Sequence, residues 1–590
     1  MAVCVQAVFA AMVLVTAHLP LCTAQEVYVT VQQGRLRGAV ETSALGLPYA
    51  SFRGVPYAQP PVGELRFQAP QPPANWDGDR DALEDPDPCP QVGMSGGFQG
   101  NEDCLYVNIY VPLNASGPFP VLTWFPVGAF KSGSAADTGP DIFLSLDIIV
   151  VAVQPRVSAM GLLSTGDEVI PGNAGMKDMV MSLQWIQQNI AAFGGDPNQV
   201  TIGGESSGGC SVSHLVLSPL TAGLFRGAII HSGEAASPWG IMADPAAKAF
   251  RLAEVLGFTA NNTQELRDFL LTVDPQDLVS HDDDIITPEV TPADLYNKQP
   301  YRPLRGLLSS YMKVPDNPLK NMMDYILSLL ILPLPPLQEE IRIQHLAWLP
   351  VLEQDVEGAF VTEWPAESLK AGRFNKVPVI TGFTSGDGLE LIRQKLYLSD
   401  PAAVQELSDN FVQIVSPILH LPTAEEREEA ALMMRDFYFG HENITIDDAQ
   451  AITDMCTDIY WGEPADATVR AASNHTDAGP IYYHLFDYRG PELGNGTYGT
   501  SHASQGFMMF YNERMGLPDP NTTFGQLRLA MIRLWSNFIK YGTPSPEGEE
   551  FIWEPFDNTN LYYAHITDTV NLEQALFKER MEFWQQNIPL

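Results

Sequence analysis

The stretch VTIGGESSGGCSVSHLVLS, residues 200–218, decides the fold of this chain. It begins with a β-branched run, passes through Gly204-Glu205-Ser206-Ser207-Gly208 and continues into a segment with a helical pattern. A G-x-S-x-G sequence between a strand and a helix predicts a sharp turn, which exposes the serine hydroxyl at the end of a sheet and above a helix N-terminus. This context predicts that Ser206 is a nucleophile; the alternative is an ordinary strand-to-helix turn.

Further strands are expected on both sides of this turn. β-Branched or aromatic apolar runs, typical of strands that are buried on both faces, occupy residues 121–125, 147–154, 227–235 and 377–383. Between the second run and the serine turn, apolar residues recur at helical spacing from Met176 to Ile190, and Gly194-Gly195 is expected to end the helix. The sequence therefore predicts an α/β domain with a mainly parallel central sheet and helices on both faces.

The chain of 590 residues shows no internal repeat, long low-complexity tract or flexible linker, so we expect one catalytic domain over residues 25–590. Residues 1–24 are apolar and end in Cys22-Thr23-Ala24, a small-residue pattern that suits signal peptidase. We expect them to be a signal peptide; a buried first helix is the alternative. Because no later run has the ~20 uninterrupted apolar residues of a membrane span, the protein is expected to be secreted and extracellular.

Acidic residues dominate the charge of the chain. Asp and Glu number 71 against 33 Lys and Arg, which gives a net charge of −38. This charge repels nucleic acid and anionic lipid surfaces, so neither is an expected partner, and a small neutral or cationic substrate is favoured. The same charge also keeps an extracellular protein in solution. The sequence alone does not indicate an oligomeric state.

Four cysteines remain after the expected signal peptide. Cys89 and Cys104 bracket 14 residues of a Gly-rich polar stretch and are expected to form a disulfide in an oxidising compartment. Cys210 and Cys456 are interpreted as buried free thiols, with a bridge between them as the alternative. Passage through the secretory pathway is also supported by six N-x-S/T glycosylation sequons, at Asn114, Asn261, Asn443, Asn474, Asn495 and Asn521.

Longer segments resemble a known family. FGGDPNQVTIGGESSG (193–208) and EDCLYVNIYVP (102–112) resemble the two signature segments of the type-B carboxylesterase and cholinesterase family. FRGVPYAQPPVGELRF (52–67) resembles its amino-terminal segment, and ERMEFWQQ (579–586) its last helix. The resemblance covers nearly all of the chain after residue 24 and implies an α/β-hydrolase fold. In such a fold, the Pro-, Leu- and Met-rich region near 285–350 is expected to be helical and to cap the substrate gorge, with plain core as the alternative.

The resemblance also implies the partners of the serine, in the chain order serine, acid, histidine. His502, in YGTSHASQGFMMF, is expected to be the general base. Asp387, in VITGFTSGDGLEL, matches the acid, which is usually Glu in the family; the shorter Asp must lie closer to the imidazole. Glu390 is the alternative acid. Glu205 and Ser232 match supporting positions behind the triad, and ordinary buried hydrogen bonding is the alternative for both.

By the same resemblance, the backbone N–H groups of Gly128, Ala129 and Ser207 form the oxyanion hole, which binds the negative charge of the tetrahedral intermediate. The family usually has His-Gly-Gly before the third small residue, whereas this chain has Pro126-Val127-Gly128. Proline fixes φ and valine disfavours left-handed backbone, so the shape of this loop is the main sequence-based argument against normal activity.

The function predicted from these residues is hydrolysis of neutral carboxylic esters through a serine acyl-enzyme. No metal-ligand cluster or phosphate-binding loop occurs, so no metal and no cofactor are expected. This function has two alternatives. A cholinesterase has a long first disulfide loop with a choline-binding tryptophan, whereas the 14 residues between Cys89 and Cys104 contain no Trp. An extracellular binding or adhesion protein is favoured by the altered oxyanion loop and opposed by the retained serine and histidine.

Overall fold

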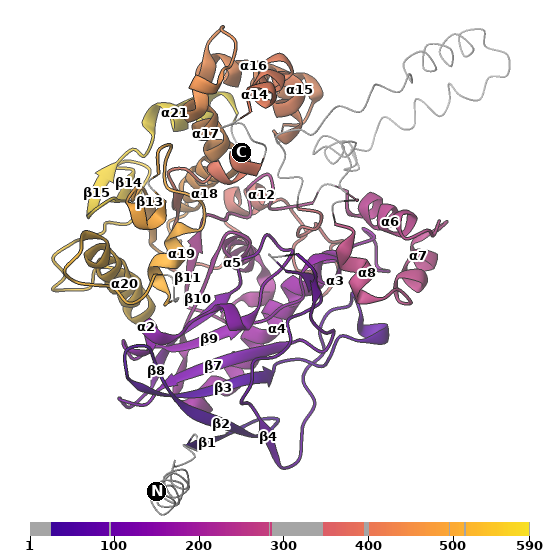
Figure 1. The fold of residues 1–590 in the computed structure, drawn as a ribbon, viewed down its shortest axis with the longest axis vertical. Helices are drawn as coiled ribbons and strands as arrows, with labels where there is room; N and C mark the ends of the chain where they lie inside the picture. The colour runs from indigo at the N-terminus through magenta and orange to yellow at the C-terminus, as the bar shows by residue number, and fades with distance from the viewer. Residues whose placement is uncertain are drawn as a thin grey trace, which may run out of the picture.

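The computed structural model describes residues 25–588, apart from 94–95, 243, 283, 286–345, 395–399, 420, 495 and 512–514. The expected signal peptide, most of the region predicted to cap the gorge, and the sequon at Asn495 lie outside the described residues. The described chain is built on one large sheet, with helices along both of its faces (Figure 1).

The sheet has 13 strands in the order β1-β2-β3-β7-β9-β8-β10-β11-β12-β13-β14-β15, with β4 paired to β2. Pairing is parallel from β9 through β8 to β14, so the predicted mainly parallel centre is confirmed. At both edges the pairing is antiparallel, except that the short β4 is parallel to β2. The strands are β1 (Glu26–Val31), β2 (Gly34–Thr42), β3 (Pro48–Pro56), β4 (Asp79–Asp81), β7 (Tyr106–Pro112), β8 (Phe119–Phe125), β9 (Ile149–Val153), β10 (Gly195–Glu205), β11 (Gly227–His231), β12 (Val379–Thr384), β13 (Ile481–Phe486), β14 (Tyr562–Ile566) and β15 (Val570–Gln574).

Helices of the described residues follow the strands of the parallel centre and also build the carboxyl-terminal part of the molecule at the top of Figure 1. They are α2 (Asp141–Leu144), α3 (Ser158–Leu162), α4 (Ala174–Asn189), α5 (Ser207–Leu217), α6 (Pro245–Val255), α7 (Thr263–Leu270), α8 (Pro275–Ser280), α12 (Pro365–Lys370), α13 (Leu389–Gln394), α14 (Pro401–Asp409), α15 (Phe411–Val415), α16 (Ala424–Phe439), α17 (Ala449–Thr457), α18 (Glu463–Ser473), α19 (Ser504–Met509), α20 (Thr523–Tyr541) and α21 (Lys578–Asn587).

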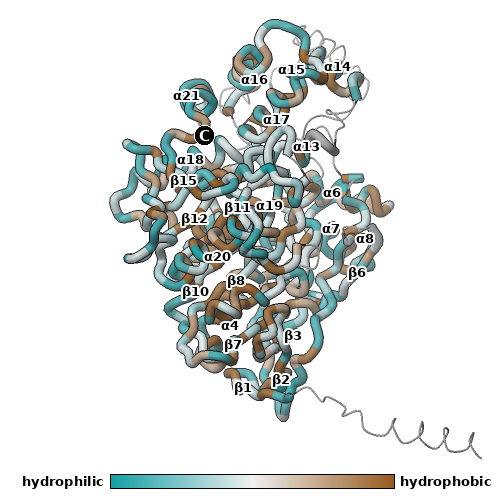
Figure 2. The backbone as a smooth tube through the Cα atoms, turned by 60° about the vertical axis from the view of Figure 1, so that its left-hand side comes forward, coloured by the Kyte–Doolittle hydropathy of each residue, from teal (hydrophilic) through white to brown (hydrophobic). Residues whose placement is uncertain are grey.

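Apolar side chains along the central strands point alternately to the two faces of the sheet, which explains why helices cover both faces. In β8, Val121 and Phe125 belong to the apolar core that contains α4 and α5, whereas Leu122 and Trp124 belong to a second core that contains α20. Since successive side chains of a strand point to opposite faces, a continuous apolar run requires helices on both sides. Figure 2 shows these strands as the brown, hydrophobic centre of the molecule.

The predicted crossover helix is confirmed, with one correction at its end. Helix α4 ends at Asn189 and is followed by a 3-10 turn, Ile190–Phe193. Gly194 alone ends this helical segment, because it takes the left-handed φ of 83° that glycine tolerates. Gly195 was predicted to share this role but is already the first residue of β10, which therefore starts before the predicted 200–204 run.

The cysteines are paired as the sequence predicted. Cys89 and Cys104 form a disulfide, whose loop holds the short hairpin of β5 (Gln91–Val92) and β6 (Phe98–Gln99). Cys210 and Cys456 are buried and free, so the alternative bridge between them is wrong.

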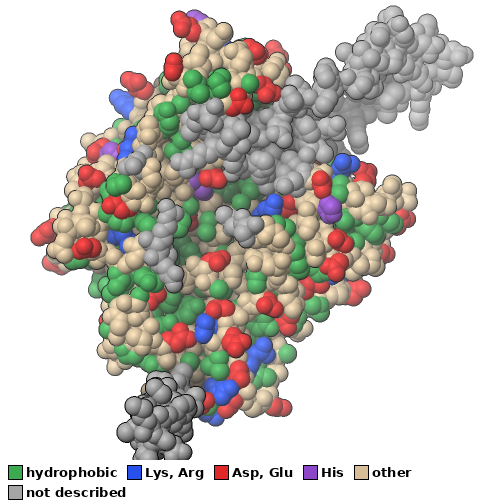
Figure 3. Space-filling model, in the orientation of Figure 1, with side chains coloured by type: hydrophobic (Ala, Val, Ile, Leu, Met, Phe, Trp, Pro, Cys, Tyr) green, Lys and Arg blue, Asp and Glu red, His purple; other side chains and the backbone are tan. Residues whose placement is uncertain are grey.

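On the face drawn in Figure 3, red acidic side chains outnumber blue basic ones and are spread between small apolar areas. This distribution agrees with the net charge of −38. None of the helices in the described ranges is long and apolar enough to cross a membrane.

Candidate active site

The serine of the G-x-S-x-G sequence lies between β10, which ends at Glu205, and α5, which begins at Ser207. Ser206 has φ 57° and ψ −123°, a conformation that a residue with a side chain rarely adopts. Glycines permit this turn: a Cβ on Gly204 would lie 2.4 Å from the backbone carbon of Gly208, and a Cβ on Gly233 would lie 2.1 Å from the Ser206 carbonyl oxygen. The close packing therefore holds the serine in its strained conformation.

Three side chains that are far apart in the sequence meet at this turn. His502 Nε2 lies 2.8 Å from Ser206 Oγ, and His502 Nδ1 lies 2.7 Å from Asp387 Oδ1. An ionised carboxylate only accepts hydrogen bonds, so Nδ1 carries the proton in the neutral imidazole and the Nε2 lone pair faces the serine hydroxyl. Glu390, the alternative acid, is an exposed residue in the first turn of α13.

The carboxylate of Asp387 is fully buried and is held through both of its oxygens. Oδ1 accepts from His502, while Oδ2 accepts from the backbone N–H of Thr384 and from Ser232 Oγ, each at 2.9 Å. Ser232 therefore contacts the acid directly, as a residue in a supporting position should. Sequence reasoning missed Thr384 and also Gln505, whose Nε2 donates to Ser232 Oγ at 2.6 Å.

The imidazole and a second buried carboxyl group influence each other. Burial lowers the pKa of His502, but the charge of Asp387 and the hydrogen bond to it outweigh burial and raise the pKa above its ordinary value. Burial raises the pKa of Glu205 to about 8, so this residue is a neutral acid near pH 7. Glu205 accepts the backbone N–H of Gly506 at 3.1 Å, which ties it to the helix that follows His502. Glu205 therefore contributes buried hydrogen bonding beside the histidine.

The loop after β8 contains three consecutive residues with positive φ. Positive φ occurs at Gly128 (149°), Ala129 (57°) and Phe130 (58°), whereas Pro126 and Val127 take no such conformation. The restrictions that proline and valine impose therefore do not coincide with the left-handed positions. The backbone of the loop therefore gives no indication that Pro126 and Val127 distort it.

The expected oxyanion donors come from two elements, the loop after β8 and the start of α5. Within the described part of the chain, the backbone N–H groups of Gly128, Ala129 and Ser207 donate to no protein acceptor. Gly208 packs against the same loop, because a Cβ there would lie 2.7 Å from the Phe125 carbonyl oxygen and 2.8 Å from that of Pro126. The turn that carries the serine and the loop that carries two of the donors are thus in direct backbone contact.

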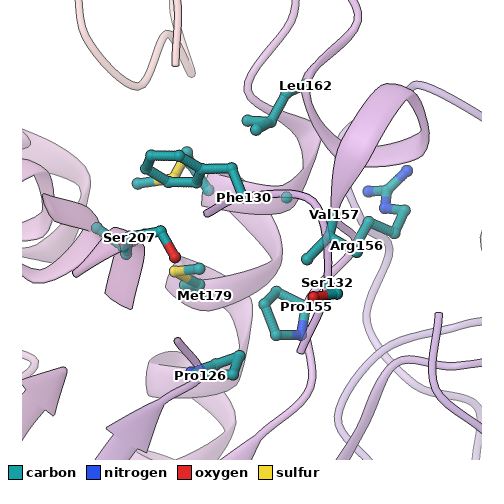
Figure 4. A pocket seen from close by; sticks show the side chains of 12 residues that line it. Pro126, Phe130, Ser132, Pro155, Arg156, Val157, Leu162, Met179 and Ser207 are labelled. Carbon is teal, nitrogen blue, oxygen red and sulfur yellow. The ribbon is translucent and has the colours of Figure 1, made fainter. Parts of the chain in front are cut away.

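A cavity of about 20 Å³ lies behind this loop, lined by Pro126, Phe130 and Met179 among others. Figure 4 shows the Ser207 hydroxyl directed into the cavity and the guanidinium of Arg156 pointing away from it. That guanidinium instead binds the buried carboxylate of Asp178, at 2.7 Å. A cavity of this size holds one water molecule, so it is too small to take an acyl chain.

A row of three aromatic rings lies next to His502. Trp461 lies in a π-helical turn, Asp458–Gly462, and its ring centre is 5.1 Å from that of His502. Trp239 lies 6.3 Å from Trp461, and Phe130 lies 6.4 Å from Trp239. These rings, which sequence reasoning missed, connect the oxyanion loop to the histidine through apolar surface. A π-turn is often found at functional sites, but its DIYWG sequence carries no signal that distinguishes it from an ordinary helix.

A serine on a strand-turn-helix elbow, hydrogen-bonded to an imidazole that a buried carboxylate orients, defines a serine hydrolase of the α/β-hydrolase fold. The family model described as "Carboxylesterase family" matches residues 25–584. The chain therefore belongs to the carboxylesterase family, and it is a carboxylic ester hydrolase.

Individual relatives agree with this assignment. The chain is 28% identical to a carboxylic ester hydrolase of Bombus ignitus, over 94% of this chain and 93% of the relative. It is 28% identical to a juvenile hormone esterase of Tribolium castaneum with the same coverage, and 29% identical to human carboxylesterase 5A over 92% of this chain and 86% of the relative. These matches favour neither the cholinesterase nor the binding-protein alternative.

Proposed function

We propose that Ser206, His502 and Asp387 are the catalytic residues of this esterase. The observation that carries the proposal is the unbroken hydrogen-bonded line from Asp387 through His502 to Ser206, with contacts of 2.7 and 2.8 Å. His502 Nε2 takes the serine proton as Oγ attacks the ester carbonyl carbon, and Asp387 stabilises the imidazolium that forms. The same proton then passes to the leaving alcohol as the carbon–oxygen bond of the ester breaks.

The oxyanion of the tetrahedral intermediate is assigned to the N–H groups of Gly128, Ala129 and Ser207. Among the described residues these N–H groups have no acceptor, which supports this role, since preorganised donors act best where no competing bond must first be broken. Water activated by His502 then attacks the acyl-enzyme, which releases the acid and restores the serine. In this mechanism Ser232 orients Asp387, and Glu205 holds the helix that follows His502 in place.

The proposed substrates are small neutral carboxylic esters. The buried rings of Trp239 and Trp461 place apolar surface next to His502, which suits an uncharged acyl or alkoxy group. A net charge of −38 disfavours the approach of anionic substrates.

We also propose that the protein enters the secretory pathway and is released as a glycoprotein. Support comes from the apolar residues 1–24 and from the disulfide between Cys89 and Cys104. The sequon asparagines that the structure describes are all exposed, as attachment of a glycan requires: Asn114, Asn261, Asn443, Asn474 and Asn521.

The test is hydrolysis of p-nitrophenyl acetate and butyrate by the secreted protein and by Ser206→Ala, combined with labelling by a fluorophosphonate. Removing the nucleophile is expected to lower kcat by at least roughly 10⁴-fold and to abolish labelling. Ser182→Ala is the control, because the hydroxyl of this buried serine donates to the Met179 carbonyl of its own helix. Labelling of another serine, or activity retained in Ser206→Ala, would refute the proposed mechanism.

A further inference from the structure

A second line of hydrogen bonds runs behind Asp387, on the side away from His502. Ser232 Oγ donates to Asp387 Oδ2 at 2.9 Å, and Gln505 Nε2 donates to Ser232 Oγ at 2.6 Å. Gln505 Oε1 in turn lies 2.6 Å from His484 Nε2. Each of these side chains is at most 1% exposed. The line joins three strands of the sheet to helix α19, since Ser232 follows β11, Asp387 follows β12 and His484 lies within β13.

Each hydrogen bond in this line has a donor and an acceptor, and His484, at the end away from Asp387, determines which group donates. A serine hydroxyl carries a single hydrogen, so Ser232 donates that hydrogen to Asp387 only while Gln505 presents its NH₂ group to the serine oxygen. The amide keeps this orientation because its oxygen faces His484 Nε2, which must therefore carry a hydrogen. Without a donor at residue 484, the amide is free to turn, and Ser232 then donates to the amide oxygen instead of to the carboxylate.

The surroundings of His484 favour this donor state. Its ring is packed among Trp535, Trp553 and His231, with centroid distances of 5.4, 6.0 and 5.5 Å. Burial lowers the pKa of His484 to about 4, so near pH 7 the ring is neutral and carries a single hydrogen. Among the described residues its Nδ1 has no hydrogen-bond partner, so the hydrogen is assigned to Nε2, which faces Gln505 Oε1. His231 accepts a hydrogen bond from Trp535 at its own Nε2 and brings no charge to this region.

We propose that His484 and Gln505 are positioning residues, which act through Ser232 to orient the carboxylate of Asp387 toward His502. This inference rests on the proposed function, because it assumes that Asp387 is the acid of the triad. A carboxylate that loses one of its donors is less firmly oriented and more basic, so it attracts the proton on His502 more strongly.

The test is the pH profile of kcat and KM for three histidine variants of the full chain. His484→Leu removes the donor and is expected to lower kcat roughly tenfold with little change in KM, and to move the acid limb of the profile to higher pH. His484→Gln supplies an amide N–H near the position of Nε2 and is expected to restore most of kcat. His214→Leu is the matched control, since His214 is equally buried and, among the described residues, bonds only the carbonyl of Gly240. Its pH profile is expected to keep its shape.

Gln505→Leu provides a second route if the leucine at residue 484 prevents folding, and it is expected to show the same loss and the same shift of the acid limb. Equal pH profiles for His484→Leu and His214→Leu, differing only in Tm, would overturn the inference, as would failure of His484→Gln to restore kcat. Failure of the proposed function gives a different pattern: Ser206→Ala or Asp387→Asn would then retain full activity, whatever the variants at residue 484 do.

Discussion

Replacement of Gly208 by alanine tests whether backbone packing at the serine turn holds the oxyanion loop in place. The added Cβ would lie 2.7 Å from the Phe125 carbonyl oxygen and 2.8 Å from that of Pro126. Both neighbours are backbone atoms, so no flexible side chain can move aside. An ordinary contact begins at 3.4 Å, and the loop must therefore retreat from α5 by about 0.7 Å, the difference between 3.4 and 2.7 Å.

This displacement is large for an oxyanion hole. The donors must lie within 2.7–3.1 Å of the oxyanion, and loss of one donor lowers kcat by roughly 10²–10³-fold. Two of the proposed donors, Gly128 and Ala129, are on the loop that must move, whereas Ser207 is on the helix that pushes it. Because the displaced donors are weakened rather than deleted, we expect Gly208→Ala to lower kcat by about 10²-fold, with a small change in KM.

The assay is steady-state hydrolysis of p-nitrophenyl butyrate, together with the rate of fluorophosphonate labelling and the Tm. Gly227→Ala is the control, because it adds the same atom to β11 at an ordinary 3.4 Å from Phe538 and is expected to keep full activity. Wild-type kcat in a folded Gly208→Ala variant would refute the reasoning, because the loop would then not depend on contact with the helix.

Two further changes address stability. Asp178→Ala leaves the buried guanidinium of Arg156 without its carboxylate, with only backbone carbonyls as acceptors among the described residues, and should lower the free energy of unfolding by about 3–5 kcal/mol. A change below about 1 kcal/mol in urea titration would contradict this. Glu205 is expected to make stability fall as pH rises from its ordinary pKa of 4.5 to about 8, since the folded state keeps a proton that the unfolded state releases. Glu205→Gln should flatten the dependence of Tm on pH in this window, and an unchanged slope would count against a neutral Glu205.

The central strands and the serine turn could be predicted from the sequence because their signals are local. Continuous apolar runs and the G-x-S-x-G turn need no knowledge of distant residues. Strands β8, β9 and β12 lie at the runs that predicted them, whereas β11 ends at His231, before the end of the 227–235 run. The partners of the serine are different, since His502 is 296 residues away and its assignment depended on family resemblance.

His484 shows why other polar residues of the site region were missed. Its segment, IYYHLF, has the composition of a buried strand, and β13 is indeed buried throughout. A single histidine within such a strand gives no sign of what it contacts, because its partner, Gln505, lies on a separate element, helix α19. Which group donates in each of these hydrogen bonds depends on how the residues meet in the folded protein, so it cannot be predicted from the sequence.

Two glycines, Gly386 and Gly499, explain how the short side chain of Asp387 reaches His502. Asp387 has one methylene fewer than Glu, so its backbone must approach the histidine loop more closely. Gly386 donates its N–H to the Thr500 carbonyl at 3.0 Å, and a Cβ on Gly386 would lie 2.9 Å from the backbone carbon of Gly499. A Cβ on Gly499 would likewise lie 2.8 Å from Gly386. Because neither residue has a side chain, the two loops meet backbone to backbone, and the aspartate reaches His502 at 2.7 Å.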